Sequence, residues 1–272
     1  MIRAGLFTLF AACLAGQAAA DPPASVVSMN LCTDQLAMML AEEGQLVSVT
    51  ALARDPSSSV MAEEAANYPI NHGRAEEIYL MAPDLVLAGA FENAATLDML
   101  RSLGIAVEVF EPANSLEDIS ARLAQMGTVL GRAPQADAAI ADFETRLAAL
   151  QSQITERPRA ALYYVNGYTS GDSTLAGQIL QAAGFDNAVT AAGYDGTRPI
   201  PLELMVMIAP DLIVTGAPYP GTSRGQDVLR HPALRAIPDA GTVQTDPNWI
   251  CGTPHVLRAI ENLAEIRRDM TE

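Results

Sequence analysis

The chain has 272 residues, half of them apolar, which is enough for one large or two modest globular domains with real cores. All 16 basic residues are arginine, and 32 acidic residues bring the net charge to −16. This acidic balance argues against a role in binding nucleic acid and against docking on anionic lipid by charge, but it suits a partner that presents arginine.

The first 20 residues have the pattern of a secretory signal peptide. One positive charge in "MIRAG" precedes the apolar run "LFTLFAACLAG", and "AAA" offers a small-residue cleavage site near Ala20. The run is too short for a membrane anchor, which needs about 20 apolar residues. Cys13 raises the alternative of a lipoprotein, although "FAA" before it fits that signal poorly. We therefore expect an exported, periplasmic protein that loses residues 1–20.

Strands and helices alternate after this segment. We predict strands at 25–29, 46–51, 84–89 and 106–111. The predicted helices are 33–44, capped by Thr33 or Asp34 and ended by Gly44, then 75–82, 95–104, and one that Ser115 caps and that continues to Leu130. Such an alternation is typical of parallel α/β units.

The alternation stops at residues 135–156, where apolar residues recur at spacings of three and four along one face of a long helix. At 1.5 Å per residue such a helix spans roughly 33 Å, about the width of a small domain. The alternation then restarts. We predict strands at 159–165, 211–216 and 241–245, and helices at 173–184, 202–209 and 253–270.

One motif occurs twice: "MAPDLVLAG" at 81–89 and "IAPDLIVTG" at 208–216. A glutamate precedes each proline by seven residues, Glu76 before Pro83 and Glu203 before Pro210. The repeat indicates an α/β fold of two similar parallel-sheet lobes joined by a single long α-helix, with a ligand cleft between the lobes. The corresponding boundaries are 21–132 for the N-terminal lobe, 133–157 for the linking helix and 158–272 for the C-terminal lobe.

Common enzyme motifs are absent from the sequence. It contains no G-x-S-x-G, no G-x-G-x-x-G and no H-E-x-x-H, and a chain without lysine has no Walker A motif. Ligands of parallel α/β sheets sit at the carboxyl ends of the strands. The loops expected there are 30–34, 166–172 and 245–254. The last holds Trp249, either as a platform that stacks on a ligand or as a plug of the core.

These residues resemble a known family. "VVSMNLCTDQLAMML", "GRAEEIYLMAPDLVL", "LGIAVEVF" and the long middle helix are similar to the periplasmic substrate-binding proteins of ABC importers for cobalamin, ferric siderophores and haem. The resemblance covers nearly the whole chain after residue 20, and the duplicated glutamate and APDL pattern is its most specific part. It implies a protein that performs no chemistry, binds its ligand between two lobes and docks on a membrane permease.

The resemblance also implies roles for individual residues. Glu76 and Glu203 match the glutamates that meet arginines of the permease, although a glutamate in the first turn of a helix also suits the helix dipole. The expected ligand-binding residues lie in the cleft loops: Asn30, Thr33, His72, Tyr168, Asp246 and Trp249. His72 could ligate iron or cobalt or make an ordinary loop hydrogen bond. Arg54 and Arg224 would suit an anionic siderophore.

The implied ligand is a metal chelate. An aromatic content of only 5% slightly weakens the case for a cobalamin cleft lined by many rings. A corrinoid such as cobalamin and a ferric siderophore rank nearly level, and haem comes third. The implied partners are an ABC permease dimer with its ATPase subunits. The chain is expected to be monomeric, with no catalytic cofactor and no resident metal.

Two cysteines depart from the usual family pattern. Cys32 and Cys251 belong to mouth loops of opposite lobes, and in an oxidising compartment two thiols are more often paired than free. A disulfide between them would tie the lobes together and restrict opening. Two free thiols, or a thiolate site for a soft metal, are the alternatives.

Two other classes of function remain open. An exported α/β hydrolase would need a nucleophile and a base, and the sequence offers no recognisable pair. A metal-ion-binding protein of related shape would need converging ligands, for which only Asp34, His72, Asp246 and His255 are available.

Overall fold

The computed structural model describes residues 21–217, 223–238 and 240–271 of the chain. The predicted signal peptide at 1–20, including Cys13, lies outside these described residues. None of the helices within the described ranges combines the length and the hydropathy that a membrane span requires.

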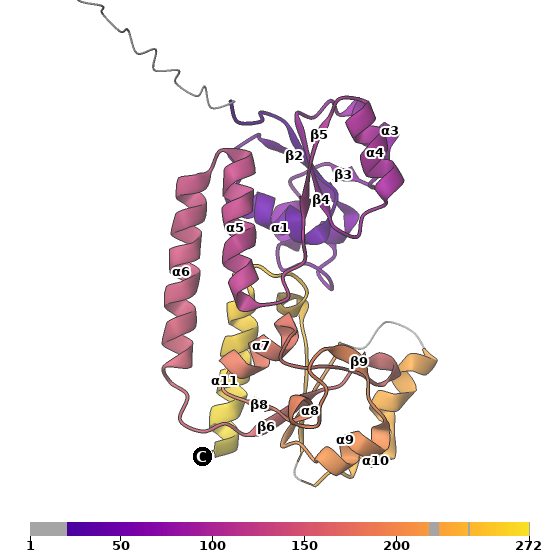
Figure 1. Cartoon of the computed structure of the whole chain (residues 1–272), viewed down its shortest axis with the longest axis vertical. Coiled ribbons are helices and arrows are strands. Elements are labelled where there is room, and N and C mark those ends of the chain that lie inside the picture. The colour runs from indigo at the N-terminus through magenta and orange to yellow at the C-terminus, as the bar shows by residue number, and fades with distance from the viewer. Residues whose placement is uncertain (1–20, 218–222, 239, 272) are drawn as a thin grey trace, which may run out of the picture.

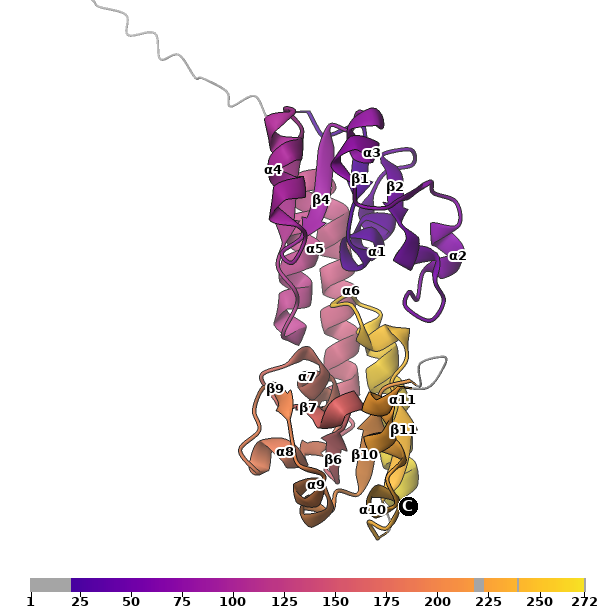
Figure 2. The ribbon, with the colours of Figure 1, turned by 90° about the vertical axis from the view of Figure 1, so that its right-hand side faces the viewer.

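The N-terminal half forms a sheet of five parallel strands in the order β3-β2-β1-β4-β5. Helices flank this sheet, with α3 and α4 on one side of the lobe and α5 on the other (Figures 1 and 2). The strands are β1 (Val26–Ser28), β2 (Leu46–Thr50), β3 (Ile70–Asn71), β4 (Leu85–Gly89) and β5 (Ala106–Phe110). The helices are α1 (Leu31–Leu40), α2 (Ala62–Ala65), α3 (Ala75–Leu80), α4 (Ala94–Ser102) and α5 (Leu116–Leu130), with a 3₁₀ turn at Ala51–Arg54.

The C-terminal half forms a second parallel sheet in the order β11-β10-β6-β8, and β7 pairs with β9 in a separate antiparallel ribbon. The strands are β6 (Arg159–Leu162), β7 (Tyr168–Ser170), β8 (Asp186–Asn187), β9 (Thr197–Pro199), β10 (Leu212–Thr215) and β11 (Gly241–Gln244). The helices are α7 (Leu175–Ala182), α8 (Ala188–Ala191), α9 (Leu202–Ile208), α10 (Pro232–Arg235) and α11 (Val256–Thr271). The 3₁₀ turns are Val165–Gly167, Arg224–Arg230 and Pro247–Trp249.

The two sheets share one topology. The order β2-β1-β4-β5 of the first sheet returns as β8-β6-β10-β11 in the second. The prediction of two similar parallel α/β lobes is therefore confirmed, including the equivalence of the two APDL segments, which lead into β4 and β10.

The APDL motif makes the same local structure in both lobes. Asp84 accepts hydrogen bonds from the backbone N–H groups of Ala24 and Ser25, both at 2.9 Å, just before β1 begins. Asp211 accepts one from the N–H of Arg159 at 2.7 Å, at the start of β6. Asp84 thus joins the start of β4 to the start of β1, and Asp211 joins the start of β10 to the start of β6. The motif's alanines, Ala82 and Ala209, take left-handed backbone conformations with φ of 49° and 45°, which costs energy for a residue with a Cβ.

The middle helix, α6 (Ala133–Gln151), ends earlier than the predicted 156. The chain beyond Gln151 is held by another contact. The buried guanidinium of Arg267 on α11 donates to the carbonyls of Gln153 at 3.4 Å and Glu156 at 3.2 Å. Pro158 further disfavours helical geometry in the residue before it.

Helix α6 packs closely on α5 (Figure 1). A Cβ on Gly127 would lie 2.4 Å from the Cβ of Ala136, so only glycine permits this approach. The predicted capping box of α5 is present, since the Ser115 hydroxyl accepts from the N–H of Asp118 and the Asp118 carboxylate accepts from that of Ser115.

One apolar core runs through both lobes. It joins strand residues of the two sheets, such as Val26 and Leu162, through buried side chains of α5, α6 and α11 that include Met126, Phe143 and Ile260. The outer face of each sheet has a smaller cluster of its own. Hinging one lobe away from the other would expose part of the shared core, so this core opposes lobe motion.

The prediction for the first helix is wrong at both ends. Helix α1 begins at Leu31 because the side chain of Asn30 caps it by accepting from the N–H of Cys32 at 2.9 Å. The predicted caps are engaged elsewhere: Thr33 bonds Ser28 and Asp34 bonds Thr50. The helix ends at Leu40 rather than at Gly44.

Candidate functional site

A cavity of about 210 Å³ lies at the carboxyl ends of β1, β4 and β5 and is completed by the C-terminal lobe. Its position agrees with the expectation for parallel sheets. The N-terminal lobe contributes most of its wall, and Ile250 and Gly252 close it from the other lobe. The residues from the strand ends and from α5 are Asn30, Gly89, Ala90, Phe91, Phe110, Glu111 and Arg122.

Asn30 is the polar residue at the centre of this wall. Its oxygen caps α1, and its amide nitrogen lies 3.4 Å from a carboxylate oxygen of Glu92. Gly89 leaves room for it, since a Cβ there would lie 2.8 Å from that nitrogen. Thr33 also lines the cavity, but it is 1% exposed and its hydroxyl lies 2.7 Å from that of Ser28. The amide of Asn30 is therefore better placed than the hydroxyl of Thr33 to meet a ligand.

Asp34 lies on the same helix, one position after Thr33, and is fully buried. One oxygen accepts from the hydroxyl of Thr50 at 2.5 Å and from its N–H at 3.1 Å, and the other has no partner among the residues described. Burial raises the pKa of Asp34 to about 7, against the lowering effect of the hydrogen bonds from Thr50. Asp34 thus joins α1, which carries the cavity residues Cys32 and Thr33, to Thr50 at the end of β2.

A disulfide joins the two lobes beside the cavity. The sulfurs of Cys32 and Cys251 are 2.14 Å apart, and their Cα atoms are 5.2 Å apart. The two lobes also approach closely at Gly252, the residue after Cys251, where an added Cβ would lie 2.1 Å from the Cβ of Ala113. The N–H of Leu116 also donates to the side chain of Gln178 across the lobes at 2.8 Å. These contacts hold one side of the site closed.

Exposed apolar side chains surround the cavity. Phe91 follows β4 and is 90% exposed, and Ile250 is 50% exposed. An aromatic ring that is left in solvent beside a cavity is available for stacking on a flat ligand. Sequence reasoning missed Phe91, although the carboxyl-end rule that selected the loops after other strands also applied to the "GAFEN" loop after β4.

Arg122 was missed as well, because it lies within a helix rather than in a loop. Its Nη1 donates to Gln125 at 2.9 Å, while its buried Nε has no hydrogen-bond partner within the part of the chain that the structure describes. The Arg122 guanidinium, the Asn30 amide and the Glu111 carboxylate are among the polar groups of the cavity lining, although the Nε of Arg122 is itself covered.

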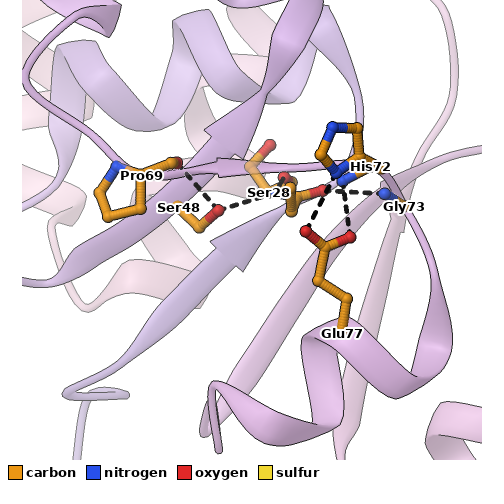
Figure 3. Close-up of polar contacts among 7 residues, drawn as sticks. Ser28, Ser48, Pro69, His72, Gly73 and Glu77 are labelled. Carbon is orange, nitrogen blue, oxygen red and sulfur yellow. Dashed lines mark hydrogen bonds and ion pairs between the residues drawn. The ribbon is translucent and has the colours of Figure 1, made fainter.

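His72 lies outside the cavity lining. It follows β3, is exposed, and binds Glu77 twice (Figure 3): its N–H donates to one carboxylate oxygen at 2.9 Å and its Nδ1 is 3.1 Å from the other. The hydrogen bond from the backbone N–H of His72 is the main reason why the pKa of Glu77 is lowered. Asn71, the preceding residue, anchors the loop by donating to Ser28 O and Ser48 Oγ at 2.8 and 3.0 Å.

The predicted residues of the C-terminal lobe also do not line the cavity. Trp249 is partly buried and packs against the shared core, as in the core-plug alternative. Asp246 caps the 3₁₀ turn before it by accepting from the N–H of Asn248 at 2.9 Å. Tyr168, in β7, is 43% exposed. Ile250 and Gly252 are therefore the residues of this lobe that line the cavity.

The two arginines proposed for an anionic ligand differ. The guanidinium of Arg54 donates to the carbonyls of Ala65, Ala66 and Tyr68, so it holds its own loop together. Arg224 is exposed at the start of a 3₁₀ turn. Neither lines the cavity.

Glu76 and Glu203 occupy the same position in their lobes. Each is exposed in the first turn of a short helix, α3 or α9, directly before an APDL segment. Within the described ranges neither forms a salt bridge, whereas Glu77 is held by His72. The two glutamates are thus available to cations of a partner.

The described residues contain no group of three or more His, Cys, Asp or Glu side chains that could hold a metal ion. The four residues considered for such a site have other surroundings. Asp34, His72 and Asp246 are engaged as described above, and burial lowers the pKa of His255, with a further contribution from Arg258.

Comparison with known proteins gives concordant matches. The model of the family described as "Periplasmic binding protein" matches residues 26–242. A cobalamin-binding protein of Halobacterium salinarum is 29% identical over 200 residues, which cover 71% of this chain and 54% of that protein. The chain therefore spans about half the length of this relative.

Two further matches cover more of the proteins concerned. A vitamin B12-binding protein of Pectobacterium atrosepticum is 29% identical over 209 residues, covering 71% of this chain and 72% of that protein. The crystal structure of a periplasmic haem-binding protein of Vibrio cholerae superposes with a TM-score of 0.75 at 20% identity, covering 89% of this chain and 98% of that one. At 20% identity the structural match shows a shared fold and nothing more.

Proposed function

The chain belongs to the periplasmic binding protein family, and from this premise we propose that it captures a metal-chelate ligand, foremost a corrinoid, between its lobes for an ABC importer. The family is one of binding proteins, and one relative, 23% identical, is named as an ABC transporter substrate-binding lipoprotein. The preference for a corrinoid is supported by two relatives named for cobalamin and vitamin B12, each 29% identical to this chain.

The observation that carries the proposal is the cavity that both lobes line, with Phe91 exposed beside it. Its volume of about 210 Å³ is below the roughly 300–1,000 Å³ of sites that enclose a small ligand. A chelate would therefore place one edge or side arm in the cavity and lay its flat face on Phe91 and Ile250. The amide of Asn30 and the guanidinium of Arg122, which both line the cavity, would meet polar side arms.

Capture of this kind requires no chemistry on the ligand. The residues supply a rigid surface, because the disulfide and the shared core fix one lobe against the other before the ligand arrives. Preorganisation lowers the entropy that binding costs. The expected site of action is the periplasm, where this disulfide would persist.

Delivery would use Glu76 and Glu203, one on each lobe, as the two contacts with arginines of the permease. Complementary charges at the rim of an interface orient two proteins and accelerate their encounter. Reversing both charges, Glu76→Arg with Glu203→Arg, should abolish transport of the ligand. The affinity for the ligand should persist, because neither glutamate lines the cavity. Transport at the wild-type rate would contradict this role.

The ligand class can be tested by calorimetric titration with cyanocobalamin, haemin and a ferric hydroxamate. We expect cyanocobalamin to bind most tightly, and Phe91→Ala to weaken binding by about tenfold, the upper range for one aromatic stacking contact. Tyr79→Ala is the matched control, since Tyr79 is a half-exposed aromatic residue on α3 that does not line the cavity. The absence of binding by all three chelates would refute the proposed function.

A further inference from the structure

Two exposed apolar side chains accompany the glutamates of α3 and α9. Leu80 is 83% exposed and Met207 is 79% exposed. Each stands four residues after its glutamate, Glu76 or Glu203. Residues at this spacing lie on one face of a helix, one turn apart. Each lobe therefore presents a carboxylate and a large apolar side chain side by side.

Leu80 and Met207 do not belong to the apolar core, because other residues of α3 and α9 make the contacts with it. Ile78 and Met205 are fully buried at equivalent positions and supply the inward apolar contact of α3 and α9. A short helix with one apolar face turned inward normally carries polar residues on its outer face. Single exposed apolar residues are common, but here the same exposure recurs at the same position in two lobes whose loops differ in length.

The N-terminal copy also has a recess beside its glutamate. A shallow groove of about 290 Å³ runs between α3 and α4, and Glu76 and Met99 are both among its lining residues. Small residues, Gly73 and Ala95 among them, leave it open. Met99 is 51% exposed and so is available at its edge. The surface beside Glu76 is thus concave and of mixed polarity, because Arg74, Asn93 and Thr96 also line the groove.

Both helices lie on one side of the molecule (Figures 1 and 2). Helices α3 and α9 lie on the side of the molecule away from α6, near opposite ends of the face turned toward the viewer in Figure 2. A single partner that covers both helices must bridge the two lobes on that face.

We propose that Leu80 and Met207 form an apolar part of the docking surface, each inserting into an apolar recess of the permease next to a docking arginine. The inference rests on the proposed function. The partner is a protein rather than the bilayer, because a chain with a net charge of −16 is repelled by anionic lipid. An apolar contact beside each ion pair excludes water from it and strengthens it.

The test measures binding of the purified protein to its host's permease–ATPase complex in lipid nanodiscs. Leu80→Ser and Met207→Ser should each weaken binding by about tenfold, and the double variant by about a hundredfold, as expected for loss of a buried large apolar side chain. Met270→Ser is the matched control, because Met270 is an exposed methionine, 38% accessible, on α11 beside α6.

Salt separates the two kinds of contact. The loss caused by Glu76→Gln with Glu203→Gln should shrink at about 0.5 M salt, where exposed charges are screened, while the loss caused by the serine variants should persist. Wild-type affinity of the serine double variant would overturn the inference. Equal binding of the wild type to empty nanodiscs would also overturn it, since lipid would then be what covers these side chains.

Cyanocobalamin, haemin and ferric hydroxamate binding, measured on the same samples, distinguishes this inference from the proposed function. Leu80 and Met207 do not line the cavity, so binding of these chelates should be unchanged in the serine variants. A wild-type protein that binds neither the complex nor any of the chelates would refute both. A wild-type protein that binds a chelate and the complex, with serine variants that dock equally well, would refute this inference alone.

Discussion

Breaking the disulfide should lower stability substantially. The bridge closes a loop with a sequence separation of 219 residues. For such a loop, chain entropy gives a stabilisation of roughly 5 kcal/mol. Unfolding a chain of about 250 described residues carries an entropy of about 0.5 kcal/mol/K, so the loss corresponds to a fall in Tm of about 10 °C. Because one core runs through both lobes, we expect the whole chain to lose this stability together.

The assay is thermal unfolding with and without a thiol reductant. The wild type should melt about 10 °C lower when reduced. The double variant Cys32→Ala with Cys251→Ala should melt low in both conditions and be indifferent to the reductant. Alkylation of the unreduced wild type tests the premise directly. Two labelled thiols in the folded protein would refute the reasoning, and so would a double variant with the same Tm as the oxidised wild type.

Two further predictions concern buried positions. The pKa of Asp34 is about 7 in the folded protein and near 4 when unfolded, so the free energy of unfolding should fall as the pH rises from about 4 to about 7. The variant Asp34→Asn should lose this pH dependence. At pH 8 it should be more stable than the wild type by up to about 4 kcal/mol. Urea titrations across this pH range check it, and a wild type that gains stability relative to the variant as pH rises would contradict it. Gly127→Ala should cost about 1–3 kcal/mol, because its Cβ would collide with Ala136, whereas Gly196→Ala, with only an ordinary contact at 3.7 Å, should be tolerated; equal costs in urea unfolding would contradict the packing argument.

The main elements of the fold were predictable from the sequence because burial repeats at clear periods. The central strands, such as Val26–Ser28 and Leu85–Gly89, are fully buried and read as short apolar runs. The capping box at Ser115 marked the start of α5 correctly. The short strand β3 and the β7–β9 ribbon leave no periodic signal and were not predicted.

The candidate site was harder to predict because it depends on which side chains a loop leaves free. Asn30 and Thr33 were both selected from one loop, yet only the structure shows that the Thr33 hydroxyl is engaged by Ser28. Arg122 reaches the cavity from a helix, and nothing in its neighbourhood in the sequence marks it. For Trp249, the choice between platform and plug depends on packing against residues distant in the chain.

The place of Trp249 has a spectroscopic consequence. It is the sole tryptophan of the chain, it precedes Ile250 of the cavity, and it stands two residues before a disulfide sulfur. Essentially all emission excited at the red edge of protein absorbance therefore originates at one point beside the site. Corrinoids and haem absorb in the range where indole emits, so a bound chelate would quench this emission by energy transfer. The protein thus carries its own unlabelled optical reporter of occupancy, with an intensity that also records whether the neighbouring sulfurs are oxidised.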